Sequence, residues 1–287
     1  MKIVRKVKYA LRFLPDVAYI QLYYLAKFKR FCNLKNPQTF NEKIQWLKLH
    51  DHKPEYIRMV DKLDAKQYIA DIIGSEYVIP TYGVWEKFED IDFGKLPSQF
   101  VLKCTHDSGG YFICRDKDRL NYKEAQTKIN ESLKHNFFWE GREWPYKSVR
   151  PRIIAEKLLI NKDNSVVSDY KFYCFDGEVY SVNVTFGRGT SEGLRVNTLD
   201  KNFKPFDISC LNYSQYDGEI VKPLNYEKML DIAATLSKGI AFARIDLYNV
   251  EGQIYVGEIT LYPGSGFNTT MSKEYDKMLG SKIKLDI

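Results

Sequence analysis

The chain has 287 residues, of which 44% are apolar and 15% aromatic, and its formal net charge is +6. This composition excludes an intrinsically disordered protein and suffices for one large domain or two closely packed lobes. No segment reaches the ~18 apolar residues that a membrane span requires. The five cysteines are scattered without a Cys-x-x-Cys pair. They predict buried thiols in a reducing compartment, so we expect a cytoplasmic protein.

The positive charge is concentrated at the N-terminus. Residues 1–36 contain nine lysines and arginines against one aspartate, a net charge of +8, so the remaining residues sum to −2. This distribution argues against a nucleic-acid partner. Amphipathic helices are predicted on both sides of Pro15. Two interpretations stay open. Residues 1–31 either pack on the domain with a solvated basic face, or dock peripherally on an anionic inner membrane surface or a membrane-bound partner.

Two helical stretches follow and lead into a strand-rich region. "NPQTFNEKIQWLKLH" predicts a helix capped by Thr39 or Asn41, and "YIRMVDKLDAKQYIADIIG" predicts a second helical stretch ended by Gly74. "YVIPTYGVW" predicts a strand that stops at Pro80. Further helices are expected near 122–136 and 226–239, and strands at 99–105, 111–115, 152–160, 170–175, 178–186, 242–248 and 253–261. Because strands and helices do not alternate regularly, the predicted class is α+β.

Residues 243–260, "ARIDLYNVEGQIYVGEIT", predict a two-stranded ribbon that places charged groups on one face. Arg244 and Asp246 share a face of the first strand, and Glu258 and Thr260 share a face of the second. With the turn centred on Glu251, Arg244 would lie opposite Glu258, and Asp246 would be their diagonal neighbour. Two carboxylates beside a guanidinium suit Mg²⁺ carrying nucleotide phosphates. A surface salt-bridge cluster is the alternative.

The stretch "FVLKCTHDSGGYFIC", residues 100–114, joins a strand lysine to a glycine-rich turn. Glycines let the backbone approach a phosphate closely, and Lys103 supplies a point charge for its oxygens. An ordinary hairpin turn is one alternative. A zinc site built from Cys104, His106 and Cys114 is another, although it lacks a paired second half.

Three weaker patterns accompany these. "RIIAEKLL" predicts an apolar strand interrupted by Glu156, either an adenine-binding edge or an ordinary edge strand. "SDYKFYC" places Lys171 on a strand, and "DKLDAK" places Asp61, Lys62 and Lys66 on an early helix. Phosphate loops of the G-x-x-x-x-G-K-[ST] and G-x-G-x-x-G types are absent from the sequence, as is a G-x-S-x-G elbow.

In this order, the patterns resemble the ATP-grasp superfamily, and most closely its teichuronopeptide-biosynthesis (TupA-like) family of bacterial surface-polysaccharide gene sets. The likeness covers roughly residues 35–275. It implies an ATP-grasp fold, in which two α+β lobes hold ATP between two antiparallel sheets. It divides the chain into a helical N-terminal region (1–60), an N-terminal lobe with the glycine-rich loop (61–158) and a C-terminal lobe with the metal site (159–287).

The resemblance also implies ATP and Mg²⁺ as cofactors and a role for each residue. Arg244 would stabilise the transferring phosphoryl group, with Lys171 and Lys103 assisting. Thr260 replaces an asparagine common in the superfamily and would support the metal only weakly. Nucleotide-binding roles fall to Lys62, Lys103, Lys171, a loop of His106, Asp107, Ser108, Gly109 and Gly110, and a hinge of Glu156, Lys157, Leu158 and Leu159. Metal-binding roles fall to Asp246, Glu258 and Thr260.

The implied activity is that of an ATP-dependent carboxylate–amine ligase. The carboxylate would belong to a uronic acid in a nucleotide sugar or a glycan of a capsular, O-antigen or teichuronic polysaccharide, and the amine to an amino acid or similar compound. The acidic substrate is expected at Arg188, Arg195 and the loop Gly264, Ser265 and Gly266. Trp139, Trp144 and Tyr146 either stack on a sugar or pack between lobes. A kinase acting on a glycan or lipid precursor and a non-catalytic nucleotide-binding scaffold remain alternatives.

Overall fold

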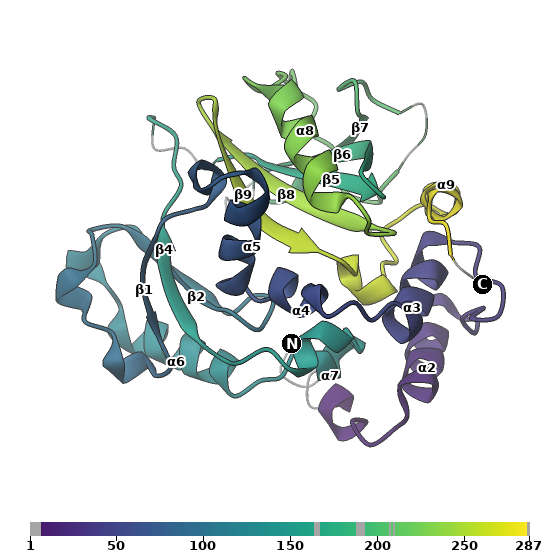
Figure 1. The fold of residues 1–287 in the computed structure, drawn as a ribbon, viewed down its shortest axis with the longest axis horizontal. Coiled ribbons are helices and arrows are strands. Elements are labelled where there is room, and N and C mark those ends of the chain that lie inside the picture. The colour runs from purple at the N-terminus through teal and green to yellow at the C-terminus, as the bar shows by residue number, and fades with distance from the viewer. Residues whose placement is uncertain (1–6, 164–166, 188–192, 207, 209, 286–287) are drawn as a thin grey trace.

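Two antiparallel sheets organise the chain in the computed structural model, which describes residues 7–163, 167–187, 193–206, 208 and 210–285. One sheet has four strands in the order β1-β4-β2-β3, and the other has five in the order β7-β6-β5-β8-β9. Most helices gather around the sheets and do not alternate regularly with the strands (Figure 1). The structure therefore confirms the predicted α+β class.

The four-stranded sheet has its own small core. Phe100, Leu102 and Ile153 pack with Ala125 and Ile129 of helix α6 (Tyr122–Leu133). Because side chains alternate along a strand, Lys103 then points to the opposite face, toward the other lobe. The strands are β1 (Thr81–Trp85), β2 (Phe100–Cys104), β3 (Tyr111–Cys114) and β4 (Ile153–Lys157).

The five-stranded sheet belongs to a larger core. Phe172 and Ile245 of its central strands pack with Met229 and Ile232 of helix α8 (Tyr226–Ser237). Figure 1 shows α8 lying across one face of this sheet. The strands are β5 (Asp169–Phe175), β6 (Glu178–Phe186), β7 (Arg195–Asp200), β8 (Ala243–Val250) and β9 (Gln253–Thr260). Strand β7 was not predicted, since it lies in a glycine-containing stretch that was interpreted as a substrate-binding segment.

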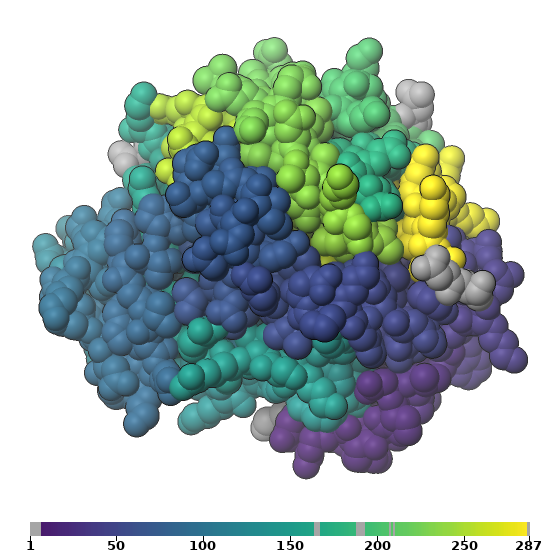
Figure 2. All heavy atoms as spheres, viewed as in Figure 1, coloured from purple at the N-terminus to yellow at the C-terminus, as the bar shows by residue number. Residues whose placement is uncertain are grey.

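Among the remaining helices, α3, α4, α5 and α9 join this larger core, whereas Ile20 and Tyr24 of α2 form a separate small cluster with Phe267. Thr39 caps α3 through a capping box with Glu42, as the sequence predicts. Arg142 donates to the carbonyl oxygens of Leu11 and Leu14, so the N-terminal residues lie against the segment around α7 (Figure 2). The helices are α2 (Asp16–Phe28), α3 (Phe40–His50), α4 (Glu55–Val60), α5 (Asp64–Ile73), α7 (Phe138–Gly141) and α9 (Lys273–Lys282). Within the described residues, no helix is both long enough and apolar enough to cross a bilayer.

The hydrophobic cores can be compared with the predicted division of the chain into three parts. Residues on both sides of the 60/61 boundary, Met59 and Ile69 among them, share the core of the large sheet. The core of the four-stranded sheet is separate and includes Phe88, Phe100 and Ile153. The three-part division at 60/61 and 158/159 stays a prediction.

Two early elements differ from the prediction. The second helical stretch is two helices, because the chain breaks at Asp61–Leu63. There the Asp61 carboxylate accepts from the N–H of Leu63, and the N–H of Lys62 donates to the carbonyl of Thr105. The predicted strand that stops at Pro80 instead begins directly after it, at Thr81. Proline has no N–H to give to a strand ladder, so the ladder of β1 starts beyond it.

Candidate active site

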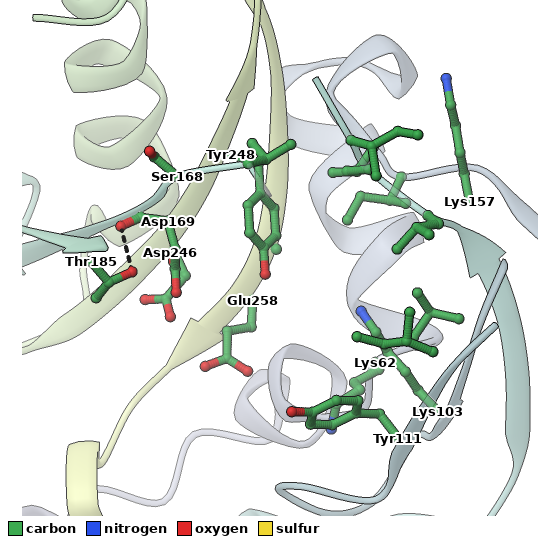
Figure 3. A pocket seen from close by; sticks show the side chains of 18 of the residues that line it. Lys62, Lys103, Tyr111, Lys157, Ser168, Asp169, Thr185, Asp246, Tyr248 and Glu258 are labelled. Carbon is green, nitrogen blue, oxygen red and sulfur yellow. Dashed lines mark hydrogen bonds between the residues drawn. The ribbon is translucent and has the colours of Figure 1, made fainter. Parts of the chain in front are cut away.

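A cavity of about 530 Å³ lies between the two sheets. Figure 3 shows Lys62, Lys103 and Tyr111 on one side of it, with Glu258 and Asp246 on the other. The short segment that joins the lobes closes one end. The cavity therefore gathers side chains from most of the patterns that the sequence singled out.

The ribbon β8–β9 supplies the acidic wall, in a register that differs from the expected one. Its turn is the pair Glu251–Gly252, both with positive φ, the geometry of a tight hairpin turn. A bulge then shifts the register beyond Asp246, so that Asp246 lies directly opposite Glu258 and Arg244 opposite Thr260. A Cβ on Gly257 would lie 2.7 Å from the ring of Tyr248, so the bulge requires glycine there.

Arg244 is the centre of the charge network on this wall. Its Nε lies 2.6 Å from Asp246 Oδ1, and its Nη2 lies 2.8 Å from Glu258 Oε1 and 3.1 Å from Thr260 Oγ1. Lys171 of the neighbouring strand β5 pairs with Asp246 and, at 2.7 Å, with Asp169. One guanidinium and one ammonium thus neutralise carboxylates that lie within a few ångströms of each other.

The two ribbon carboxylates respond differently to this environment. Partial removal from water would raise the pKa of Glu258, but the charges of Arg244, Lys171 and Lys62 outweigh it and hold that pKa at about 2. For Asp246, burial dominates over the same arginine and lysine and raises the pKa above its ordinary value. Lys62 belongs to the opposite wall, so the two walls are electrostatically coupled across the cavity.

The lysine wall is organised by Glu156. This carboxylate is 4% exposed and lies 2.5 Å from Lys103 Nζ and 2.7 Å from Lys66 Nζ. Burial would raise the pKa of Glu156, but the two lysines outweigh it and lower that pKa. Glu156 does not itself line the cavity, whereas Lys157, Leu158 and Leu159 do. The Glu156 side chain therefore pairs with the two lysines, and its predicted role in the adenine-binding hinge stays a prediction.

The glycine-rich loop divides into a base and a tip. Ser108, Gly109 and Gly110 line the cavity. His106 and Asp107 are buried instead: His106 Nε2 lies 2.9 Å from the carbonyl oxygen of His135, and Asp107 accepts from the hydroxyl of Ser132. Lys62 donates to the carbonyl of Asp107. His106 and Asp107 thus anchor the loop on α6, and only the loop tip reaches the cavity.

The end of the cavity at the joining segment is apolar. Leu158 and Leu159 lie there with Ile79, Val101, Ile113, Ile160 and Val167. Apolar walls beside exposed backbone of a connecting segment fit a flat heteroaromatic ring, whose edge needs hydrogen bonds and whose faces need apolar contact. The charged and apolar ends together match the two parts of a nucleoside triphosphate.

Several lining residues were missed by the sequence interpretation. Asp169, Tyr111, Tyr248 and Thr185 all face the cavity (Figure 3). For Asp169 a signal exists, since it precedes Lys171 by two residues and so shares its face of β5. The three hydroxyl residues carry no such signal, because nothing local separates them from core positions.

The predicted substrate residues lie in three different settings. Arg188 lies outside the described residues. The Arg195 guanidinium stacks over Tyr216 at 4.9 Å, and Tyr216 stacks in turn on Phe186, which lines the cavity. Gly264, Ser265 and Gly266 form a tight turn directly beyond β9 and are not among the cavity-lining residues.

The other candidates of the sequence are packing residues. Trp144 Nε1 donates to the carbonyl of Asp51 and the hydroxyl of Tyr262, and Trp139 lies against the Arg142 guanidinium. Cys104 and Cys114 are buried. Among the described residues, no group of three His, Cys, Asp or Glu side chains could hold a metal ion by itself. This result argues against the zinc site. At Asp246 and Glu258, a metal ion would need further oxygen ligands, which a bound phosphate could supply.

A cavity between two antiparallel sheets, with lysines and a glycine-rich loop on one side and an acidic ribbon on the other, is the arrangement of an ATP-grasp protein. The chain belongs to the TupA-like ATP-grasp family, whose sequence model matches residues 42–284. The resemblance drawn from the sequence is therefore confirmed, and with it the fold. No curated protein sequence matches the chain.

Solved structures with a similar fold include several ligases. D-alanine–D-alanine ligase from Helicobacter pylori has a TM-score of 0.47 at 12% identity, over 85% of this chain and 69% of that one. The Bacillus anthracis ligase complexed with ATP gives 0.46 at 18%, over 78% of this chain and 63% of that one, so the chain spans less than two thirds of it. D-cycloserine synthetase DcsG gives 0.42 at 14%, over 80% and 72%.

Proposed function

We propose that the protein is an ATP-dependent carboxylate–amine ligase that forms an amide bond through an acyl phosphate. The observation that carries this proposal is the pairing of Asp246 and Glu258 across from Lys103 on a single cavity. Family membership supports it. ATP would lie with its base at Leu158 and Leu159 and its phosphates between the lysine wall and the ribbon.

The residues fit Mg²⁺ and a triphosphate. Asp246 and Glu258 offer hard oxygen ligands, and Mg²⁺ favours one or two carboxylates completed by phosphate oxygens and water. A bound Mg²⁺ would supply charge neutralisation at the phosphates. Thr260, with its hydroxyl 3.1 Å from Glu258 Oε1, would orient that carboxylate.

The chain's own cations would do the rest of the electrostatic work. A substrate carboxylate must approach a negative γ-phosphate, so the barrier is largely charge repulsion. Arg244 would stabilise the transferring phosphoryl group, and Lys62, Lys103 and Lys171 the remaining phosphate oxygens. Closure of Ser108–Gly110 would exclude water that otherwise hydrolyses the acyl phosphate.

For the acceptor we propose a uronic-acid carboxylate of a bacterial surface-polysaccharide precursor, with an amino acid or similar amine as the second substrate. The family supports this assignment, as does Arg195 beside an aromatic stack that reaches the cavity. Aromatic faces and arginine together suit an acidic sugar. A kinase would use the same nucleotide residues but need only one hydroxyl acceptor.

The test is an ADP-release screen of the purified protein with Mg-ATP. Uronic acids and their nucleotide conjugates are crossed against amino acids, each also alone. A ligase releases ADP steadily only when carboxylate and amine are both present, and the product gains the mass of the amide. Steady release with one hydroxyl substrate would establish the kinase instead. Mg-ATP binding without turnover under every pairing would establish the scaffold.

We also propose that the N-terminal surface contacts an anionic membrane. Apolar side chains stay exposed there beside basic ones, with Asp16 as the single acid of residues 7–31. Such a surface suits lipid head groups and their acyl boundary. The exposed apolar residues are Val7, Tyr9, Phe13, Val17, Leu22 and Phe31.

Sedimentation with vesicles of phosphatidylglycerol and phosphatidylcholine tests this contact. Wild-type protein should bind the anionic vesicles and lose binding as salt rises, since the attraction is screened. Phe13→Glu should weaken it, whereas Tyr213→Glu, at another exposed aromatic, should not. Equal binding to pure phosphatidylcholine, or none at low salt, contradicts the proposal.

A further inference from the structure

The turn Pro263–Gly266 is held in an unusual backbone conformation. Gly264, Ser265 and Gly266 have φ values of 57°, 55° and 68°. The left-handed region costs a residue with a side chain free energy and persists only where the surroundings impose it. Ser265 is therefore a point at which the protein maintains strain, directly beyond the strand that carries Glu258 and Thr260.

Two side chains of helix α3 hold the turn from one side. Lys48 Nζ donates to the carbonyl of Ser265 at 2.7 Å and to that of Gly141 at 2.6 Å. Gln45 Nε2 donates to the carbonyls of Ser265 at 3.0 Å and Gly266 at 2.6 Å. Lys48 is 2% exposed and forms no ion pair within 4.0 Å with a described residue. Burying an ammonium group without a carboxylate is costly, so its two carbonyl contacts demand an explanation.

Glu143 holds the turn from the other side. It is 5% exposed, and its Oε1 accepts the Ser265 hydroxyl at 2.6 Å. A Cβ on Gly141 would collide with the Ser265 hydroxyl, and a Cβ on Gly266 would lie 2.6 Å from Gln45 Nε2. Contacts from two segments far apart in sequence thus converge on one residue, with no room left around it.

We infer that Gln45, Lys48 and Glu143 are positioning residues that fix the Pro263–Gly266 turn for the carboxylate substrate. The inference rests on the proposed function and on the expectation that the loop Gly264, Ser265 and Gly266 contacts the acidic substrate. The turn follows directly after the strand that carries Glu258. The contacts that fix the turn would therefore also fix its position relative to the phosphates of bound ATP. Gln45 and Lys48 of helix α3 hold it from one side, and Glu143 holds it from the other.

Both charged groups of this cluster, Lys48 and Glu143, are buried, and burial shifts both of their pKa values. The pKa of Glu143 is raised to about 7, chiefly by burial and also by the nearby charge of Glu258, while the Ser265 hydrogen bond and the charge of Lys48 oppose the rise. Burial also lowers the pKa of Lys48 to about 7. The charge of Glu258 therefore reaches Glu143, so the cluster lies within the electrostatic range of the ribbon β8–β9.

The first experiment compares Glu143→Gln with Glu143→Leu and includes Lys48→Met. An amide oxygen can still accept the Ser265 hydroxyl, so Glu143→Gln should stay within about threefold of wild type. Glu143→Leu and Lys48→Met should each raise the KM for the carboxylate by about tenfold or more, the loss expected for one hydrogen bond to a charged group. The Kd for Mg-ATP, measured by calorimetry, should change by less than about twofold.

A second pair isolates the backbone conformation. Ser265→Ala and Ser265→Gly both remove the hydroxyl, but only glycine adopts a positive φ without steric cost. Ser265→Gly should therefore retain the lower KM for the carboxylate. Equal KM values in the two variants would contradict the role of the left-handed conformation.

Hydrogen exchange of the peptide spanning 262–268 separates this inference from the proposed function. With UDP-glucuronate as the probe carboxylate, exchange should rise in Glu143→Leu and Lys48→Met but not in Glu143→Gln. Unchanged exchange, or an equal loss of Mg-ATP affinity, overturns the positioning role. A wild-type protein that releases no ADP with any carboxylate overturns the proposed function, and exchange at the turn then still decides whether these side chains hold it.

Discussion

The two walls of the cavity both pair their buried charged side chains with side chains of opposite charge, but the charge left over has the opposite sign on the two walls. On the four-stranded lobe, one buried carboxylate, Glu156, sits between Lys66 and Lys103. On the five-stranded lobe, Arg244 and Lys171 sit among Asp246, Glu258 and Asp169. On the four-stranded lobe the carboxylate is buried and a lysine faces the cavity. On the five-stranded lobe the arginine and lysine lie between carboxylates. The groups named here sum to +1 on the four-stranded lobe and −1 on the five-stranded lobe, so most of the charge of each wall is neutralised within that wall.

The exposed fractions of these side chains show which groups on each wall a ligand can reach. The Lys103 side chain is 23% exposed while that of Glu156 is 5%, and the Glu258 side chain is 46% exposed while that of Asp246 is 4%. Lys103 and Glu258 are thus the accessible members, and Glu156 and Asp246 the buried members that fix them. Phosphates would meet ammonium groups on one wall and metal-bound carboxylates on the other.

Removing the buried acid of the ribbon should have the largest effect. Asp246→Asn keeps the shape but removes a metal ligand and the partner of Arg244 and Lys171. We expect Mg-ATP turnover to fall by about 10³-fold or more, with the fold intact by circular dichroism. Asp231→Asn, at an exposed position of α8, is the matched control. Turnover at the wild-type rate in Asp246→Asn would end the assignment of this ribbon.

Removing the accessible cation of the other wall should have the next largest effect. Lys103→Met should raise the Kd for Mg-ATP by about 10- to 100-fold, since one charge-assisted contact to phosphate is lost. Lys123→Met is the control, because Lys123 is exposed on helix α6 and is not among the cavity-lining residues. Calorimetric titration measures both. Equal losses in the two variants would mean that general charge, and not the wall, binds phosphate.

The sequence predicted which charged residues share a face of the ribbon β8–β9, but it did not predict the register between the two strands. Strand alternation alone places Arg244 and Asp246 on one face, so the acidic ribbon follows from local pattern. Its register does not, because the bulge depends on how Gly257 packs under Tyr248. Relative to the expected register, the partner of Asp246 moved by two residues, one from the turn and one from the bulge, so the charged side chains stayed on one face.

Long-range contacts account for most of the remaining differences. Glu156 was interpreted as part of an adenine edge because its strand is apolar, yet its partner Lys66 lies on α5, remote in the chain. Ser265 was expected at the substrate, but its contacts with Lys48 and Glu143 join three separate segments. No local periodicity encodes such pairs, whereas helix caps such as Thr39 are local and were predicted.

Removing the buried acid of the lysine wall should act on stability more than on binding. Glu156→Gln leaves Lys66 and Lys103 without their shared charge, although the amide still accepts hydrogen bonds. We expect the free energy of unfolding in urea to fall by about 2 kcal/mol, with a smaller change in Mg-ATP affinity than in Lys103→Met. Glu178→Gln, at an exposed strand end, is the control. A larger effect on affinity than on stability would place Glu156 at the nucleotide after all.

The smallest expected effect concerns Lys48 and Glu143, beside the turn Pro263–Gly266. It tests whether the positive charge of Lys48 stabilises the ionised form of Glu143. Burial raises the folded pKa of Glu143 to about 7, so its stabilising contribution is complete below about pH 4.5 and is lost as pH rises toward 7. Lys48 opposes that rise in pKa. Lys48→Met should therefore move the pKa of Glu143 higher and extend the loss of stability to more alkaline pH.

The measurement is urea unfolding of Lys48→Met at pH 6, 7 and 8. Between pH 6 and 8, the variant should lose about 2 kcal/mol more stability than wild type. It loses the opposing titration of Lys48, whose folded pKa is lowered to about 7, as well as the effect of Lys48 on Glu143. The double variant Lys48→Met, Glu143→Gln should remove that extra pH dependence, because no titrating acid remains at the turn. If the double variant keeps it, another group carries the titration, and the charge of Lys48 does not set the pKa of Glu143.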